Sequence, residues 1–314
     1  LNIDNLIKAL KEKAIKYSNI SMLSRTHGQT ASPSTMGKEF ANFVHRISSI
    51  NKSIKETALK GKINGAVGNF NAHSIAYPEV NWEIVSKKFI KELGLEVNTH
   101  TTQVEPKDSI AELFFHYVRL NNVLIDFSRD IWGYISLGYF KQKLKKGEIG
   151  SSTMPHKVNP IDFENAEGNL GLANANFQHL SNTIVISRWQ RDLSDSTIMR
   201  NIGLCYGHTN LALSSLLKGI YKLEINKDQL KHDLDSSWEV LTEAIQTILR
   251  KHLIKDGYEL MKELSRGKKI SKEDLHHLID KIDIPSDERQ ALKNLTPSSY
   301  TGIAKTLAKQ LKDG

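Results

Sequence analysis

Apolar residues recur along this chain at steps of three and four residues, the spacing of one buried helix face. The steps run without a break from Met36 to Ile54, from Leu113 to Ile131 and from Ala166 to Ile184. Each run covers about five helical turns, and the long intervals between prolines leave room for such helices. The pattern therefore predicts three long helices that pack lengthwise in a bundle.

Start and stop residues indicate where further helices lie. Ser32 followed by Pro33 is typical of a helix start, and Gly61 is typical of a stop. A fourth helix, with looser apolar spacing, is predicted from about Ser196 to Tyr221. Alternating patterns typical of strands are scarce throughout. The predicted fold class is therefore all-α.

The final third of the chain changes character, because its helical segments become shorter and more charged. Ser271-Lys-Glu-Asp274 resembles a capping box, and Pro285-Ser286 predicts another helix start. Two domains are therefore expected: a central long-helix bundle over residues 1–222 that carries the catalytic loops, and a small C-terminal helical domain over 223–314.

Composition and charge are ordinary for a soluble globular protein. Of 314 residues, 39% are hydrophobic and 25% charged, and no apolar run is long enough to span a membrane. The net charge of +8 comes from basic residues scattered among acidic ones. A polyanionic small substrate or a well-solvated surface explains that charge as well as nucleic acid does. We expect neither a nucleic acid nor a membrane as partner.

The single cysteine, Cys205, excludes an internal disulfide and suits a reducing compartment. Its apolar, helical surroundings favour buried packing over a reactive thiol. We therefore expect a cytoplasmic protein.

Cofactor and metal motifs are missing from the sequence. It contains no His-x-x-x-His pair, no Cys–His cluster and no glycine pattern of a nucleotide-binding loop. We expect no metal and no cofactor.

The segment Gly150–Pro160 combines a glycine, two prolines, hydroxyl side chains, a lysine and an asparagine between two predicted long helices. Such a composition does not suit a core. It fits a polar connecting loop, and it equally fits a loop that presents hydroxyl, ammonium and amide groups to a ligand. Composition alone leaves both interpretations open.

The same segment resembles the loop pattern G-S-S-x-M-P-x-K-x-N-P of the fumarase/aspartase superfamily at every fixed position. Within that superfamily the chain is most similar to the adenylosuccinate lyase branch, and the resemblance extends over essentially all 314 residues. The other segments that carry it are Ser24–Gln29, Lys62–Asn69, Thr101–Gln103, Ile161–Asn165 and Ser187–Thr197.

This resemblance implies an enzyme that releases fumarate by β-elimination. The implied substrates are adenylosuccinate, which would give AMP, and the succinylated aminoimidazole carboxamide ribotide of purine biosynthesis. Two alternatives stay open: another fumarate-releasing lyase such as argininosuccinate lyase, and a structural paralogue without catalysis.

Such an elimination needs a base for a weak carbon acid, an acid for the departing nitrogen, and donors that stabilise the developing negative charge. By resemblance, Ser151 is the general base and His27 the general acid. Glu164 is the carboxylate that orients the imidazole. A serine needs nearby positive charge to act as a base, and Lys157 is placed to supply it. An imidazole holds and releases a proton near neutral pH.

The resemblance also assigns substrate contacts. Arginines and hydroxyls near a helix start suit a phosphate, which is the role implied for Arg191, Ser196, Thr197 and Arg200. The remaining implied substrate-binding residues are Thr26, Gln103, Ser152, Lys157, Asn159 and Asn165.

Relatives of this kind are homotetramers in which several subunits build each active site, so a homotetramer with shared sites is expected. They also have a further N-terminal domain. We therefore expect the 314-residue chain by itself to have little activity.

Overall fold

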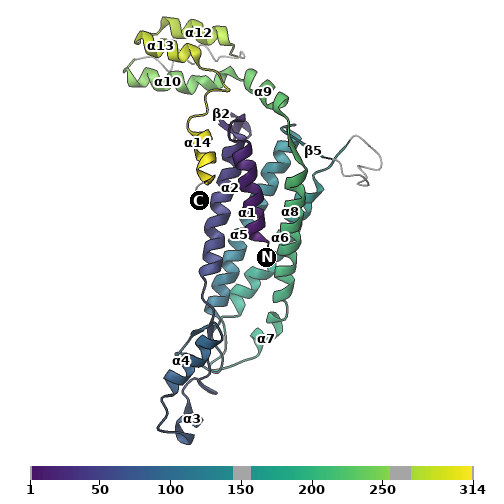
Figure 1. Ribbon diagram of the computed structural model, residues 1–314, viewed down its shortest axis with the longest axis vertical. Coiled ribbons are helices and arrows are strands. Elements are labelled where there is room, and N and C mark those ends of the chain that lie inside the picture. Colours follow the sequence, from purple (N-terminus) through teal and green to yellow (C-terminus); the bar gives the residue numbers. More distant parts are fainter. Residues whose placement is uncertain (1, 144–156, 255–269, 313–314) are drawn as a thin grey trace. The chain divides into compact units, whose positions relative to one another are not determined.

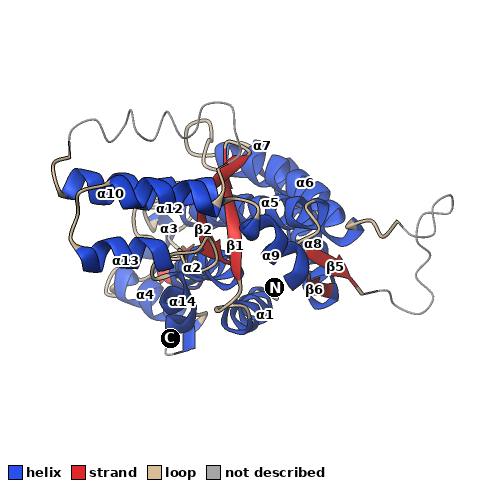
Figure 2. Ribbon diagram, turned by 90° about the horizontal axis from the view of Figure 1, so that it is seen from above, coloured by secondary structure: helices blue, strands red, loops and turns tan. Residues whose placement is uncertain are grey.

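The computed structural model describes residues 2–143, 157–254 and 270–312. Helices make up most of these residues, and the strands among them are short (Figure 2). The chain forms two compact units. Unit 1 consists of Leu1–Ile7, His45–Gly133 and Ile149–Tyr221, and unit 2 of Lys8–Val44, Tyr134–Glu148 and Lys222–Gly314. The expected division into domains 1–222 and 223–314 stays a prediction.

Unit 1 is built mainly from helices, and it shares α1 (Ile3–Lys16), α2 (Met36–Glu56) and α5 (Asp108–Ser136) with unit 2. Short strands β3 (Lys60–Gly61) and β4 (Glu96–Val97) pair in parallel. The other helices of unit 1 are α3 (Asn71–Ala76), α4 (Trp82–Glu92), α6 (Ile161–Thr183), α7 (Ser194–Met199) and α8 (Ile202–Lys222).

No helix of the described segments combines the length and hydropathy needed to cross a membrane.

The predicted long helices are confirmed as α2, α5 and α6, which contain the three apolar runs except for Ile184, the residue directly after α6. Nearly every apolar position of those runs is buried, as the 3.6-residue period requires for a helix with one face in a core. The largest fully buried side chains of α5 and α6 are Phe114, Phe127, Phe163 and Phe177.

Helices α5, α6 and α8 run side by side along unit 1 (Figure 1). Near the start of α5, Phe114 packs on Phe177 near the end of α6, with ring centroids 5.3 Å apart. Tyr206, near the start of α8, contacts both rings. Toward the other end, Phe127 of α5 packs on Phe163 of α6. Helix α6 is therefore antiparallel to both of its neighbours.

A β-hairpin replaces the predicted helix start at Ser32 and Pro33. Strand β1 (Ser21–Thr26) pairs with β2 (Gln29–Thr35), and α2 begins only at Met36. The pairing register shifts between Met22 and Ser24, opposite the proline, and a bulge is where a strand tolerates a residue without an N–H. Pro33 therefore marks an irregularity in a strand, and the prediction of a helix start was wrong.

Unit 2 contains this hairpin and a set of short helices around a core that includes Leu241, Ile245, Leu275 and Leu278. Strands β5 (Phe140–Gln142) and β6 (Leu223–Ile225) pair antiparallel. The helices are α9 (Lys227–Asp235), η1 (Trp238–Leu241), α10 (Thr242–Lys251), α12 (Lys272–Lys281), α13 (Ser286–Asn294), α14 (Ala304–Lys309) and η2 (Gln310–Lys312).

The other predicted helix limits can also be compared with the structure. Ser271 accepts a hydrogen bond from the backbone N–H of Asp274 and completes a capping box, and α13 starts at Ser286, so both starts are confirmed. The predicted stop at Gly61 was wrong, because α2 ends at Glu56. The predicted fourth helix is divided between α7 and α8, which are separated at Arg200.

Close packing of α8 on α6 makes a glycine necessary at position 219. A Cβ there would lie 2.8 Å from Phe163 Cζ, whereas a Cβ at Gly207 of the same helix meets no atom within 4 Å. We expect Gly219→Ala to destabilise the protein by about 1–3 kcal/mol through overpacking. Gly207→Ala is the matched control and gains up to about 1 kcal/mol from helix propensity. Urea unfolding measures both, and equal effects would contradict the packing.

Candidate active site

The predicted general acid, His27, lies at the tip of the β1–β2 hairpin in unit 2. Thr26 pairs with Gln29, which leaves His27 and Gly28 as a two-residue turn. Both turn residues have positive φ, 54° and 77°, as a type I′ turn requires. Histidine is one of the few non-glycine residues enriched in this conformation. The turn exposes the imidazole together with the Thr26 side chain.

A partly buried polar cluster of unit 2 holds the hairpin two residues before the imidazole. Arg25 Nη1 donates to Tyr139 Oη at 2.7 Å, and Arg25 Nη2 donates to Asp233 Oδ2 at 2.9 Å. The Tyr139 hydroxyl donates to the same carboxylate oxygen at 2.8 Å, and Gln229 donates to the other oxygen. The hairpin is therefore fastened to α9, which carries Asp233.

The pKa values in this cluster follow from burial and charge. Burial raises the pKa of Tyr139 to about 12, and the hydrogen bond from Arg25 offsets only part of that effect. Burial would also raise the pKa of Asp233, but hydrogen bonds from Arg25 and Tyr139 and the guanidinium charge hold it below its usual value. Asp233 is thus a carboxylate, and Arg25 and Asp233 form an ion pair.

In unit 1, the segment around Gln103 is held through its backbone. Lys62 Nζ donates to the carbonyl oxygens of Gly65 at 2.7 Å, Thr102 at 3.0 Å and Gln103 at 2.7 Å. The backbone N–H of Gln103 donates to the carbonyl of Gln190 at 3.2 Å. The structure therefore places the predicted substrate-binding Gln103 beside the loop that leads to Arg191.

Arg191 belongs to a compact charged group. Its Nη1 donates to Asp195 Oδ1 at 2.8 Å, while Lys107 Nζ lies 2.7 Å from Asp195 Oδ2. Burial would raise the pKa of Asp195, but Lys107 and Arg191 together hold it below its usual value. Two cations share one carboxylate, so this group keeps a net positive charge that suits an anionic ligand.

The other predicted phosphate residues follow in the same segment. Ser196 is half-buried, and Thr197 and Arg200 are exposed around α7. The loop before α7 is ordered by Asp192, whose carboxylate accepts from the backbone N–H of Arg188 and from Ser194. All four predicted phosphate residues therefore lie within one short stretch of unit 1.

A second set of predicted residues lies at the start of α6. Glu164 Oε1 accepts from the Trp132 indole N–H at 3.0 Å. Asn165 Oδ1 accepts from Ser215 Oγ at 2.8 Å and from the Asn169 amide. These bonds orient Glu164 and Asn165, while their side chains stay exposed. His27 belongs to unit 2, so the proposed orientation of its imidazole by Glu164 stays a prediction.

Of the predicted residues in the Gly150–Pro160 segment, the structure describes the last two. Lys157 and Asn159 are exposed just before α6. Ser151 and Ser152 lie outside the described residues, and their roles stay predictions.

The two sets of predicted residues in unit 1, those around Gln103 and Arg191 and those around Glu164 and Asn165, lie at opposite ends of its bundle. The Lys107–Asp195 pair sits directly before α5, whereas the Trp132–Glu164 bond sits near the end of α5. About 24 residues of helix separate these points, which at 1.5 Å per residue is about 35 Å. A substrate of nucleotide size therefore cannot touch both sets within one chain.

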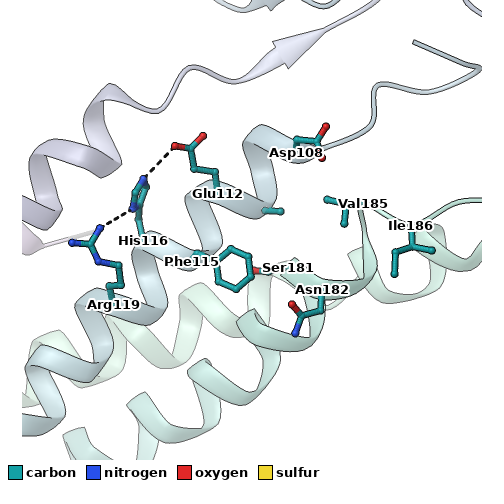
Figure 3. A pocket seen from close by; sticks show the side chains of 10 residues that line it. Asp108, Glu112, Phe115, His116, Arg119, Ser181, Asn182, Val185 and Ile186 are labelled. Atoms are coloured by element: carbon teal, nitrogen blue, oxygen red, sulfur yellow. Dashed lines mark hydrogen bonds and ion pairs between the residues drawn. The ribbon is translucent and has the colours of Figure 1, made fainter. Parts of the chain in front are cut away.

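A cavity of about 540 Å³ lies between the start of α5 and the end of α6, and none of its lining residues belongs to the predicted site. Figure 3 shows His116 between Glu112 and Arg119 on one wall. Opposite are apolar side chains, among them Val185 and Ile186. Within the described residues, no three His, Cys, Asp or Glu side chains are grouped to hold a metal ion.

Comparison with known proteins gives the family. A family model described as "Lyase" matches residues 2–173, and one described as "Adenylosuccinate lyase C-terminal" matches residues 187–301. The adenylosuccinate lyase of Buchnera aphidicola subsp. Schizaphis graminum is 55% identical over 307 residues, which are 98% of this chain and 67% of the relative. This chain belongs to the adenylosuccinate lyase family. The enzyme family predicted from the sequence is thereby confirmed.

Two further adenylosuccinate lyases give the same result. The protein of Vibrio cholerae is 56% identical over 310 residues, covering 98% of this chain and 68% of the relative. That of Escherichia coli strain K12 is 53% identical over 307 residues, covering 98% and 67%.

Solved structures confirm the predicted long-helix fold. A fumarate lyase from Mesorhizobium sp. BNC1 superposes with a TM-score of 0.75 at 19% identity, covering 100% of this chain and 71% of its own. A 3-carboxy-cis,cis-muconate lactonizing enzyme from Pseudomonas putida gives 0.74 at 19% identity, covering 99% and 70%. At this identity the likeness shows the fold alone.

Several polar residues of this chain were not predicted from the sequence. Asp195 follows Arg191 by four residues, a spacing typical of helical ion pairs that could have suggested the contact. The partners of Lys107 and Arg25 are far away in the sequence, at Asp195 and Asp233. No local pattern indicates such distant pairs.

The Arg25–Asp233 pair leads to a prediction about stability. The two side chains are 27% and 19% exposed. Asp233→Asn should therefore cost about 2 kcal/mol at pH 7, between the values for exposed and buried pairs. Folding lowers the pKa of Asp233, so the stability that the ion pair adds is present above pH 3.8, the usual pKa of an aspartate. This stability is lost as the pH falls through the lower pKa that Asp233 has in the folded protein.

Denaturant unfolding between pH 7 and pH 3 tests this, with the exposed Asp228→Asn of the same helix as control. The difference in free energy of unfolding between wild type and Asp233→Asn should become smaller at low pH. A difference that does not change with pH contradicts the ion pair.

Proposed function

We propose that this protein splits adenylosuccinate into AMP and fumarate, and cleaves the succinylated aminoimidazole carboxamide ribotide in the same way. The observation that carries the proposal is 55% identity to an adenylosuccinate lyase over 98% of the chain, together with the intact segment Gly150–Pro160. A chain that had lost catalysis would have no need of every polar side chain of that loop.

The reaction moves two protons in opposite directions. A base takes a proton from the succinyl carbon next to a carboxylate, and the electron pair of that C–H bond forms the new C=C bond of fumarate. The C–N bond breaks, and an acid protonates the departing nitrogen. Negative charge builds up on the adjacent carboxylate, so cationic and amide donors must surround it.

The roles are those that the resemblance implies, and the chemistry of the side chains suits them. Ser151 takes the carbon proton, and Lys157 supplies the positive charge that a serine base needs. Lys157 and Asn159 also hold the succinyl carboxylates. His27 protonates the nitrogen, and an exposed imidazole at the tip of a two-residue turn suits that role. Glu164 orients this imidazole.

The positively charged group around Arg191 in unit 1 binds the nucleotide end of the substrate. Arg191, Thr197 and Arg200 bind the phosphate, together with Ser196. Gln103 contacts the substrate beside them, and the hydrogen bond from its backbone to Gln190 supports this arrangement. Thr26, Ser152 and Asn165 complete the substrate contacts.

Each active site is built by more than one subunit of a homotetramer. The separation of about 35 Å between the two sets of unit 1 supports this, because one substrate must meet both. Exposed large apolar side chains also lie along the long helices, where a partner would cover them. They include Phe115, Trp132, Leu172, Leu204 and Leu211.

The enzyme is cytoplasmic.

Removal of the base should abolish turnover without abolishing binding. We expect Ser151→Ala, in the enzyme as its gene encodes it, to lower kcat by about 100-fold to 10,000-fold, because general base catalysis contributes about that much. Substrate Kd should change little. The absorbance change on fumarate release measures the rate with adenylosuccinate, and with argininosuccinate as the negative control. Normal turnover by Ser151→Ala excludes this base.

Mixed oligomers test whether the sites are shared. Gln103→Ala and Glu164→Gln variants, each nearly inactive, should regain activity when subunits are exchanged, because about one site in four then receives both native residues. A mixture of Gln103→Ala with Arg191→Ala should stay inactive, since those residues lie at the same end of one chain. Equal recovery in both mixtures contradicts the shared site.

A further inference from the structure

Lys62 has an unusual set of partners for a lysine. Its ammonium group donates to three backbone carbonyl oxygens, those of Gly65, Thr102 and Gln103, at 2.7–3.0 Å. An ammonium group has three N–H donors, so these three acceptors satisfy it completely. The ammonium group is partly removed from water, and this burial lowers the pKa of Lys62.

The carbonyls belong to two segments that are far apart in the sequence. Gly65 lies in the loop after β3, whereas Thr102 and Gln103 precede α5. Further contacts hold the same two segments together: Thr101 Oγ1 donates to the buried Asn64 at 3.0 Å, and Asn64 donates to the carbonyl of Thr99 at 3.4 Å. Lys62 is therefore the charged member of a clasp between the loops.

Gly68 shows how closely these loops approach. Its φ is +87°, and a Cβ built there would lie 1.9 Å from the carbonyl oxygen of Thr101. The contact leaves no space for a side chain, so the two backbones are in direct contact at this point. The position of the 99–103 segment is thus set by the 62–68 loop.

The clasp extends to the charged group around Arg191. Gln103 receives the Lys62 ammonium on its carbonyl oxygen, and its N–H donates to the carbonyl of Gln190, the residue before Arg191. Backbone bonds on both sides of Gln103 therefore place its side chain and the start of the phosphate segment together.

We propose that Lys62 is a positioning residue. It holds the Gln103 amide and the Arg191 guanidinium where they can bind the substrate, without touching the substrate itself. This inference rests on the proposed function of Gln103 and Arg191. It assigns to Lys62 a role that acts through backbone carbonyls, so that the geometry of three convergent donors matters as well as the charge.

The test compares Lys62→Met with Lys60→Met, a change of an exposed lysine two residues away. In the enzyme as its gene encodes it, Lys62→Met should raise KM for adenylosuccinate about tenfold or more, with a smaller change in kcat, because binding contacts are misplaced. AMP should bind correspondingly more weakly. Lys60→Met should match wild type.

A double-mutant cycle separates positioning from general stabilisation. If Lys62 acts partly through the Gln103 amide, Lys62→Met should lower kcat/KM less in the Gln103→Ala background than in the wild type, because only the effect on Arg191 remains. Fully additive losses, or a wild-type KM in Lys62→Met, overturn the proposal. Lys62→Arg keeps the charge, but its planar fork cannot converge on three carbonyls, so it should restore KM only in part.

Two further measurements keep the test decisive. If Lys62→Met does not fold, Thr101→Val removes one hydrogen bond of the same clasp, and a wild-type KM in that variant overturns the proposal. Hydrogen exchange gives a readout that does not need activity: the Gln103 amide should exchange roughly tenfold faster in Lys62→Met. Unchanged exchange refutes the clasp, whereas wild-type enzyme that releases no fumarate refutes only the proposed function.

Discussion

Packing of α5 and α8 against the antiparallel α6 is the constraint on which the rest of unit 1 depends. The apolar faces of these helices bury their aromatic side chains along the whole length of the bundle. Once that packing is made, chain segments that enter helices in opposite directions must lie at opposite ends. The polar residues with roles in chemistry are attached to those ends, so the length of the helices determines the distance between them.

Polar contacts add to the apolar core in holding the loops that carry the candidate active-site residues; Leu23 of the hairpin belongs to the core of unit 2. In unit 2 an ion pair with a shared tyrosine hydroxyl fastens the hairpin behind His27. In unit 1 a lysine bound to carbonyls and a carboxylate shared by two cations hold the segments around Gln103 and Arg191. Hydrogen bonds to ionised groups are directional and strong, so they can fix a loop that buries little apolar surface.

The sequence was informative wherever a local rule decides the structure. Periodic apolar residues predicted α2, α5 and α6, and Ser271 predicted its capping box, because both depend on neighbours within one or two turns. The hairpin at Ser32 and Pro33 was missed, because a proline after a serine is also typical of a helix start. The strand forms there because β1 supplies a partner, and such tertiary pairing overrides local preference.

The candidate site shows the same division. Resemblance supplied the residues of the loops, but the pairs Lys107–Asp195 and Arg25–Asp233 join distant parts of the chain and leave no periodic trace. The break at Arg200 between α7 and α8 was also invisible in the apolar spacing, which continues through it.

The two-residue turn at His27 and Gly28 has a consequence for how this part of the chain can vary. Side chains of a strand alternate between its faces, so one extra or missing residue in the turn would move every later residue of β2 to the opposite face. Pro33 would then leave its bulge, and α2 would start out of phase with the core. The length of this turn is thus bound to the packing of the helix that follows it, and the imidazole at its tip cannot be shifted along the chain independently of that helix.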